Sequence, residues 1–120
     1  MKVLTLDGTE NTPKVTLDKK NGIFEISGRS LLDDTAQFYK PILEWIKEYS
    51  AEPNPGTDFT IKLEYFNTTS SKVLLDIFSA LENIKGAKIV WCFQDDDEDM
   101  EEKGEEFAEL VNIPFEFKAH

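Results

Sequence analysis

Residues 63–78 read LEYFNTTSSKVLLDIF, a stretch that begins with the pattern of a strand and ends with that of a helix. Before it, apolar and polar residues alternate, which predicts one strand face made of Phe59, Ile61, Leu63 and Tyr65. After it, apolar residues recur at helical spacing: Leu74, Ile77, Phe78, Leu81 and Ile84. The sequence therefore predicts a strand over about 58–66 that leads directly into a helix over about 70–85.

Four consecutive hydroxyl residues, 68–71, lie at this junction and are followed by Lys72. The helix cap is Asn67, Thr68, Thr69 or Ser70, because each can accept a hydrogen bond from a free backbone N–H. A cap accounts for one or two polar residues, not for four hydroxyls and a lysine. Two interpretations stay open: a plain cap, or a phosphate acceptor whose charge Lys72, one turn on, partly neutralises.

The N-terminal half predicts a hairpin followed by a helix. Residues 14–18 and 23–27 are strand-like, and the Asn21–Gly22 pair between them is a strong turn signal. Residues 2–6 form either a short opening strand or an ordered arm. A helix follows from Asp33 or Asp34 to about residue 50, and Pro41 either kinks it or begins its main part. Its apolar face is expected to hold Phe38, Ile42, Trp45, Ile46 and Tyr49.

The C-terminal half continues the alternation of strands and helices. Gly86 is expected to end the second helix. The apolar run 87–93 predicts a strand buried on both faces. A helix over about 101–111, with Phe107, Leu110 and Val111 on its apolar side, precedes a last strand over 114–118. The order β-β-α-β-α-β-α-β predicts an α/β fold with a mixed sheet, formed by residues 1–120 as a single domain.

Charge and composition exclude several classes of function. Residues 94–120 hold eleven acidic residues and two lysines, so most of the net charge of −11 lies there. That charge disfavours a nucleic acid or an anionic membrane as partner and is compatible with a basic protein. No apolar run reaches the length of a membrane span, and the N-terminus lacks a secretory pattern. The single Cys92 fits a reducing cytoplasm, where we expect it to be a small core residue.

Enzymatic chemistry finds little support in the residues. The only histidine, His120, is the last residue of the chain, which is a poor position for a preorganised base. There is no glycine-rich phosphate loop. Asp95, Asp97 and Asp99 begin a calcium-loop spacing, but Met100 stands where that loop needs glycine. We therefore expect no catalytic residues, no metal site and no cofactor.

The segment Glu64–Lys72 resembles the signature of the SiaC family of bacterial regulatory phosphoproteins. Three further segments are similar to that family in the same order along the chain: Asn11–Val15, Phe38–Ile46 and Asp76–Phe78. The resemblance covers nearly the whole chain and implies a fold like that of the STAS-domain anti-sigma-factor antagonists.

The resemblance also implies a function. Members of the family switch partners: a dedicated kinase phosphorylates a hydroxyl at the strand-to-helix junction, a PP2C-type phosphatase removes the phosphate, and the effector of the best-known system is a diguanylate cyclase. The family's phosphothreonine corresponds to Thr68. Because Thr69 replaces a serine common in relatives, Thr69 and Ser70 remain secondary candidates. The phosphate environment and partner surface are then expected at Asn67, Thr69, Ser70, Ser71 and Lys72.

Two other hypotheses remain. The chain is an interaction module with the same fold and no phosphorylation, or an enzyme that uses the same hydroxyls. A hydroxyl cluster that is never modified in cells would favour the module. The enzyme hypothesis requires a turnover that is lost in Thr68→Ala or Ser70→Ala.

Overall fold

A computed structural model describes all residues, 1–120, as a six-stranded sheet and three helices. The strands are β1 (Leu4–Leu6), β2 (Lys14–Asp18), β3 (Ile23–Ser30), β4 (Thr57–Phe66), β5 (Ala87–Phe93) and β6 (Phe115–Ala119). The helices are α1 (Thr35–Tyr49), α2 (Thr68–Leu81) and α3 (Glu98–Leu110). The expected mixed α/β order is confirmed, and residues 4–6 do form an opening strand.

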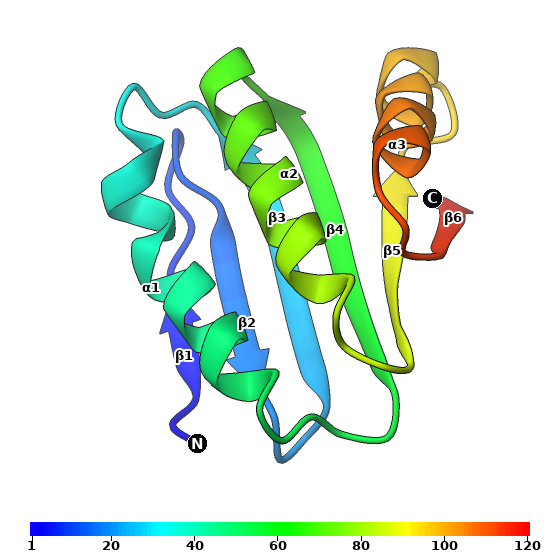
Figure 1. Cartoon of the computed structure of the whole chain (residues 1–120). Helices are drawn as coiled ribbons and strands as arrows, with labels where there is room; N and C mark the ends of the chain where they lie inside the picture. The colour runs from blue at the N-terminus through cyan, green and yellow to red at the C-terminus, as the bar shows by residue number, and fades with distance from the viewer.

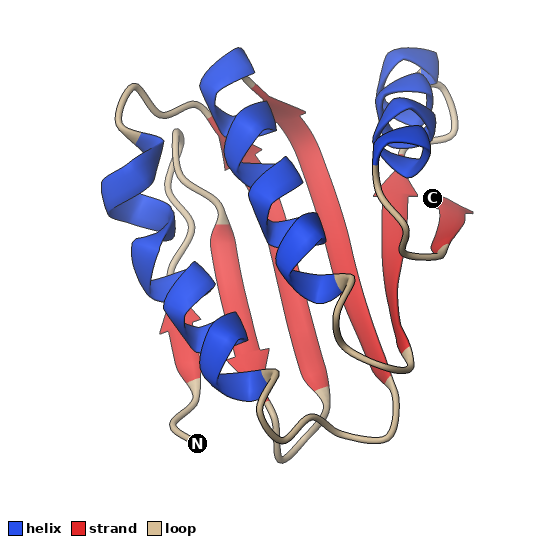
Figure 2. Cartoon of the chain, viewed as in Figure 1, coloured by secondary structure: helices blue, strands red, loops and turns tan.

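The strands lie in the sheet in the order in which they occur in the chain (Figure 1). Strands β1, β2 and β3 pair antiparallel, and β3, β4, β5 and β6 pair parallel. Each parallel step needs a crossover, which α1, α2 and α3 supply. Figures 1 and 2 show α1 and α2 side by side across one face of the sheet, with α3 beside them next to β5 and β6.

The opposite face of the sheet carries no helix, so many of its side chains reach solvent. Lys62 and Glu64 of β4 are exposed there, and Lys88 and Cys92 of β5 are half-buried. The expectation that β5 is buried on both faces is therefore wrong, although Val90 is covered. Cys92 is not a core residue either, and partial burial raises the pKa of its thiol.

Helix α1 begins with Asp34, whose carboxylate accepts a hydrogen bond from the Gln37 N–H at 3.3 Å. The helix runs without interruption from Thr35 through Pro41, so Pro41 does not begin it. Its buried face contains Tyr39, whereas Phe38, which we expected there, is only half-buried. The other four predicted residues, Ile42, Trp45, Ile46 and Tyr49, are buried as expected, so only the first position of the buried face differs from the prediction.

The two other helices differ from the prediction at their ends. Helix α2 ends at Leu81, and Gly86 lies in the following turn, where its φ of 81° is easily adopted by glycine. A Cβ at Gly86 would come within 2.6 Å of the Pro55 carbonyl oxygen. Helix α3 begins at Glu98 because Asp97 caps it, and Leu110, which we expected in its buried face, is 68% exposed.

Helix α3 packs on β5 through a small residue. Gly104 is buried, and a Cβ there would lie 2.5 Å from the Trp91 ring. The Trp91 indole N–H donates to the Met100 carbonyl at 3.0 Å, which fixes the ring beneath α3. The core is one contiguous cluster of 27 buried residues. No helix has the length and apolar character needed to cross a membrane.

Candidate functional site

The candidate site is the junction between β4 and α2. Asn67 is the cap: its side-chain oxygen accepts from the Ser70 N–H at 3.0 Å, and its side-chain nitrogen donates to the Leu32 carbonyl at 3.0 Å. The Asn67 backbone N–H donates to the Ser30 carbonyl at 3.1 Å. Of the four cap candidates the sequence allowed, Asn67 takes the role, and it ties the junction to the end of β3.

The end of β4 departs from strict alternation. Pairing with β3 passes from Gly28–Leu63 to Arg29–Tyr65, so Glu64 has no partner residue in β3. This irregularity turns Tyr65 outward, where it is 47% exposed, and Phe66 inward. The prediction that Tyr65 shares the buried face is therefore wrong. Its exposed aromatic ring lies beside the hydroxyl cluster.

The four hydroxyl residues occupy different environments. Thr68 and Thr69 are exposed, Ser71 is half-buried and Ser70 is fully buried. The Thr69 hydroxyl donates to the Leu32 carbonyl at 2.8 Å, and it also lies 3.2 Å from the Asn67 side-chain oxygen. The hydroxyls of Thr68 and Ser71 have no hydrogen-bond partner in the chain. Thr68 is thus both accessible and free.

Ser70 belongs to a buried network of hydroxyls. Its Oγ donates to the Ser30 carbonyl at 2.9 Å and lies 2.7 Å from the Ser30 Oγ. The Ser30 Oγ is in turn 2.7 Å from the Tyr39 hydroxyl. Burial raises the pKa of Tyr39 to about 12, and the hydrogen bond between its hydroxyl and the Ser30 Oγ opposes that shift. The network joins α2, β3 and α1, and it hides Ser70 from any modifying enzyme in the folded chain.

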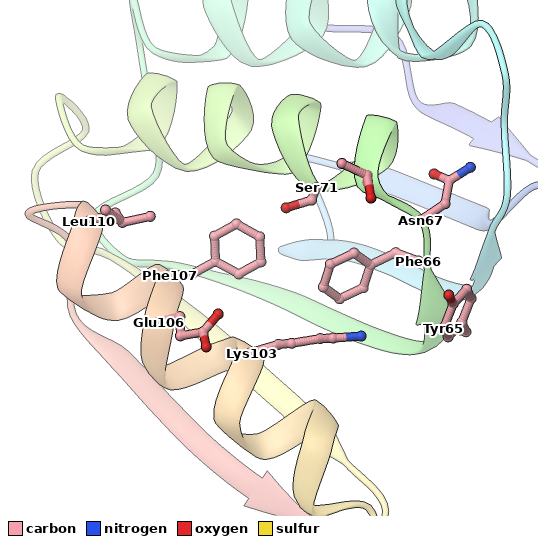
Figure 3. A pocket seen from close by; sticks show the side chains of 9 residues that line it. Tyr65, Phe66, Asn67, Ser71, Lys103, Glu106, Phe107 and Leu110 are labelled. Atoms are coloured by element: carbon pink, nitrogen blue, oxygen red, sulfur yellow. The ribbon is translucent and has the colours of Figure 1, made fainter.

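A pocket of about 360 Å³ opens beside Thr68, between α2 and α3 (Figure 3). Its apolar lining comes from two aromatic rings of β4 and two side chains of α3, and its polar lining from α2 and α3. The lining residues are Tyr65, Phe66, Asn67, Thr68, Ser71, Lys103, Glu106, Phe107 and Leu110. Figure 3 shows the Phe66 and Phe107 rings in the space between the two helices.

The charged side chains in this pocket are Lys103 and Glu106, both from α3. The Lys103 ammonium rests 5.2 Å from the centroid of the Tyr65 ring and 5.1 Å from that of Phe66. The ion pairs of the chain involve Lys40, Lys88 and Lys118, and Lys103 takes part in none of them.

Lys72, the lysine expected beside the phosphate, faces elsewhere. It lines a separate groove between α1 and α2, together with Thr69. Sequence reasoning therefore missed the nearest cation in the Thr68 pocket, because Lys103 lies 35 positions away in an acidic segment. The adjacent aromatic residues Tyr65 and Phe66 were the only local hint of a pocket.

The acidic segment forms no metal centre. No group of three or more His, Cys, Asp or Glu side chains is placed to hold a metal ion. Asp97 instead caps α3, where its carboxylate accepts from the Met100 N–H at 3.0 Å. Of the three aspartates in the calcium-loop spacing, Asp97 thus serves as the helix cap.

Comparisons with known proteins agree with this geometry. A family model described as "SiaC family regulatory phosphoprotein" matches residues 6–120. A protein of Pseudomonas aeruginosa (strain UCBPP-PA14) is 28% identical, with 100% of this chain and 98% of that protein covered. The crystal structure of apo-SiaC from Pseudomonas aeruginosa is similar with a TM-score of 0.89, at 26% identity over 99% of this chain and 100% of that one.

A further similar structure contains a complex. It is the crystal structure of the diguanylate cyclase SiaD with its activator SiaC from Pseudomonas aeruginosa. The match has a TM-score of 0.88 and 27% identity, and it covers 98% of this chain and 99% of the other.

Proposed function

Because the chain belongs to the SiaC family of regulatory phosphoproteins, we propose that it is the switchable component of a bacterial partner-switching system, with Thr68 as its phosphorylated residue. As a member of this family of regulatory phosphoproteins, the chain is a signalling protein and not an enzyme. One contiguous core joins the sheet and all three helices, which supports a single regulatory domain over residues 1–120.

The observation that carries the choice of Thr68 is the different exposure of neighbouring hydroxyls. The hydroxyl of Thr68 is exposed, free of hydrogen bonds and open to a pocket. Ser70 is fully buried, so its modification would require opening the junction. Thr69 is exposed but its hydroxyl is held by the Leu32 carbonyl, which makes it the second candidate.

The proposed switch acts on a docking surface and leaves the fold intact. A phosphate adds about −1.5 to −2 charges at pH 7. At the first turn of α2 the helix dipole and the free backbone N–H groups favour that charge. A partner seated flat over Thr68 would have to desolvate the phosphate without enough donors, which is strongly unfavourable. Phosphorylation is therefore expected to release the partner.

Three protein partners follow from this proposal: a cognate kinase, a PP2C-type phosphatase and an effector. The effector we propose is a diguanylate cyclase, and the similar SiaC structure in complex with SiaD supports it. The pocket beside Thr68, with its exposed Tyr65 ring, offers an apolar contact for such a partner. We place the chain in the cytoplasm, with no nucleic-acid, membrane, metal or cofactor partner.

The test compares two forms of the same protein. The chain is prepared unmodified and with phosphothreonine encoded at position 68, and each form is titrated by calorimetry with a diguanylate cyclase from the same host. We expect phosphorylation to weaken binding at least about 100-fold, or roughly 2.7 kcal/mol. A Thr68→Val variant, which lacks the hydroxyl but adds no charge, is expected to bind like the unmodified protein. Equal affinity of both forms would contradict the switch and favour the interaction module without phosphorylation.

A further inference from the structure

We infer that, once Thr68 is phosphorylated, the Lys103 ammonium of α3 binds the phosphate group in an ion pair that crosses the pocket between α2 and α3. The inference rests on the proposed phosphorylation of Thr68 and adds a residue that the hydroxyl motif does not contain. Lys103 is then the chain's own ligand for the phosphate, and it comes from the opposite wall of the pocket.

Thr68 and Lys103 line the same pocket, Thr68 from the first turn of α2 and Lys103 from the middle of α3. Figure 3 shows the Lys103 side chain extended from α3 toward Tyr65, at the end of the pocket where β4 passes into α2. A lysine ammonium sits on a flexible four-carbon stem, so it can swing toward a new charge without movement of α3.

In the unmodified chain, Lys103 is held only weakly. Its ammonium rests on the faces of the Tyr65 and Phe66 rings, 5.2 and 5.1 Å from their centroids, and has no carboxylate within 4.0 Å. This is unexpected for a lysine on a helix with so many acidic residues. A phosphate dianion attracts an ammonium more strongly than the face of a half-exposed ring does.

No other cation lines the pocket beside Thr68. Lys72 lines the groove between α1 and α2 with Thr69, on the other side of the first turn of α2. The remaining charge in the Thr68 pocket is Glu106, which repels a phosphate. The pocket thus holds one group that favours the dianion and one that opposes it, and their opposite effects can be measured separately.

The ion pair changes the shape of the site as well as its charge. It removes the ammonium from the Tyr65 and Phe66 rings and joins α2 to α3 across the mouth of the pocket. The apolar pocket available to a partner in the unmodified chain is then bridged in the phosphorylated one.

The test is a phosphorus-31 NMR titration of the full chain with phosphothreonine encoded at position 68, so that no kinase is needed. An ammonium beside the phosphate stabilises the dianion and lowers the pH at which it forms. Lys103→Met keeps the apolar stem and is expected to raise that titration midpoint by roughly 0.2 to 0.7, the size of one exposed ion pair. Lys103→Arg should keep the low midpoint, Lys72→Met should leave it unchanged, and Glu106→Gln should lower it.

A second measurement reports on the lysine itself. The Lys103 Hε protons lie near two ring faces, so their resonances are expected upfield in the unmodified chain and should move downfield on phosphorylation. An unchanged midpoint in Lys103→Met, or an equal rise in Lys72→Met, would overturn the inference. Neither result would bear on whether the host phosphorylates Thr68, because the phosphate is encoded. Conversely, absence of phosphate in the host would leave the titration result standing.

Discussion

Thr68 and Ser70 are two residues apart in one cluster, yet they face opposite kinds of environment. Thr68 looks into an open pocket toward α3, and its hydroxyl has no partner. Ser70 points into the sheet, where its hydroxyl contacts Ser30 and, through it, Tyr39. The periodicity of α2 exposes the hydroxyl of Thr68, the phosphorylation site that we propose, and directs the hydroxyl of Ser70 inward, where it holds the first turn of the helix in place.

The largest expected effect on stability comes from a charge placed at Ser70, in the buried network of hydroxyls. Ser70→Asp puts a carboxylate into the buried network and should lower the free energy of unfolding by about 4 kcal/mol or more. Thr68→Asp puts the same charge on the exposed side of the same turn, where the helix dipole should stabilise the fold by roughly 0.3–1 kcal/mol. Urea denaturation gives the free energy of unfolding of both variants. Similar losses in the two would contradict the difference in environment between Ser70 and Thr68.

Alkaline pH should lower the free energy of unfolding, because Tyr39, which belongs to the hydroxyl network of Ser70 and Ser30, ionises less readily in the folded chain than in the unfolded one. Its pKa in the folded chain is about 12, above the ordinary value of 10.0, so the unfolded chain loses its proton first. The contribution to stability is complete below pH 10 and is lost as pH rises through 12, with a total of about 3 kcal/mol. Denaturation series from pH 8 to 11.5 should show most of this loss in the wild type and not in Tyr39→Phe. The control Tyr65→Phe, at the exposed tyrosine, should keep the loss, and its disappearance there would refute the assignment.

The pocket beside Thr68 depends on how closely α3 approaches the sheet. Gly104→Ala places a Cβ against the Trp91 ring and should destabilise the chain by about 2 kcal/mol, although alanine is the better helix former. Glu105→Ala, at the exposed neighbouring position, is the matched control and should change stability by less than about 0.5 kcal/mol. Thermal unfolding of both variants tests this, and a stable Gly104→Ala protein would mean that α3 tolerates displacement from β5.

The smallest expected effect separates the two lysines. Lys103→Ala removes an ammonium from two ring faces and should lower the free energy of unfolding by about 0.5–1 kcal/mol. Lys72→Ala, an exposed lysine with no ion pair, should be neutral within about 0.5 kcal/mol. Chemical denaturation at low and high salt distinguishes the variants. A larger loss of stability in Lys72→Ala than in Lys103→Ala would contradict this assignment, because Lys72 lies in the groove between α1 and α2 and not in the pocket beside Thr68.

The sequence predicted the features that depend on local pattern. The strand-to-helix junction, the Asn21–Gly22 hairpin and the alternation of strands with helices appear as expected, because periodicity and turn chemistry act over a few residues. The family resemblance named Thr68, but local pattern gave no means to separate Thr68 from Ser70. The difference between them depends on Ser30, which lies 40 positions away.

The errors share one physical origin, which is contact between distant segments. Tyr65 is exposed because β4 slips by one residue against β3. Leu110 is exposed because α3 buries Gly104 and Met100 instead, both of which lie against Trp91. Cys92 is half-exposed because all three helices lie on the other face of the sheet. None of these contacts leaves a trace in residue spacing.

The most direct test of the account is a map of phosphorylation in protein recovered from its own host. Intact mass gives the number of phosphates, and sequencing of the peptide that spans residues 62–85 assigns them. The account predicts a single phosphate on Thr68 and none on Ser70. Phosphate on Ser70, or an unmodified cluster under every growth condition, would contradict it.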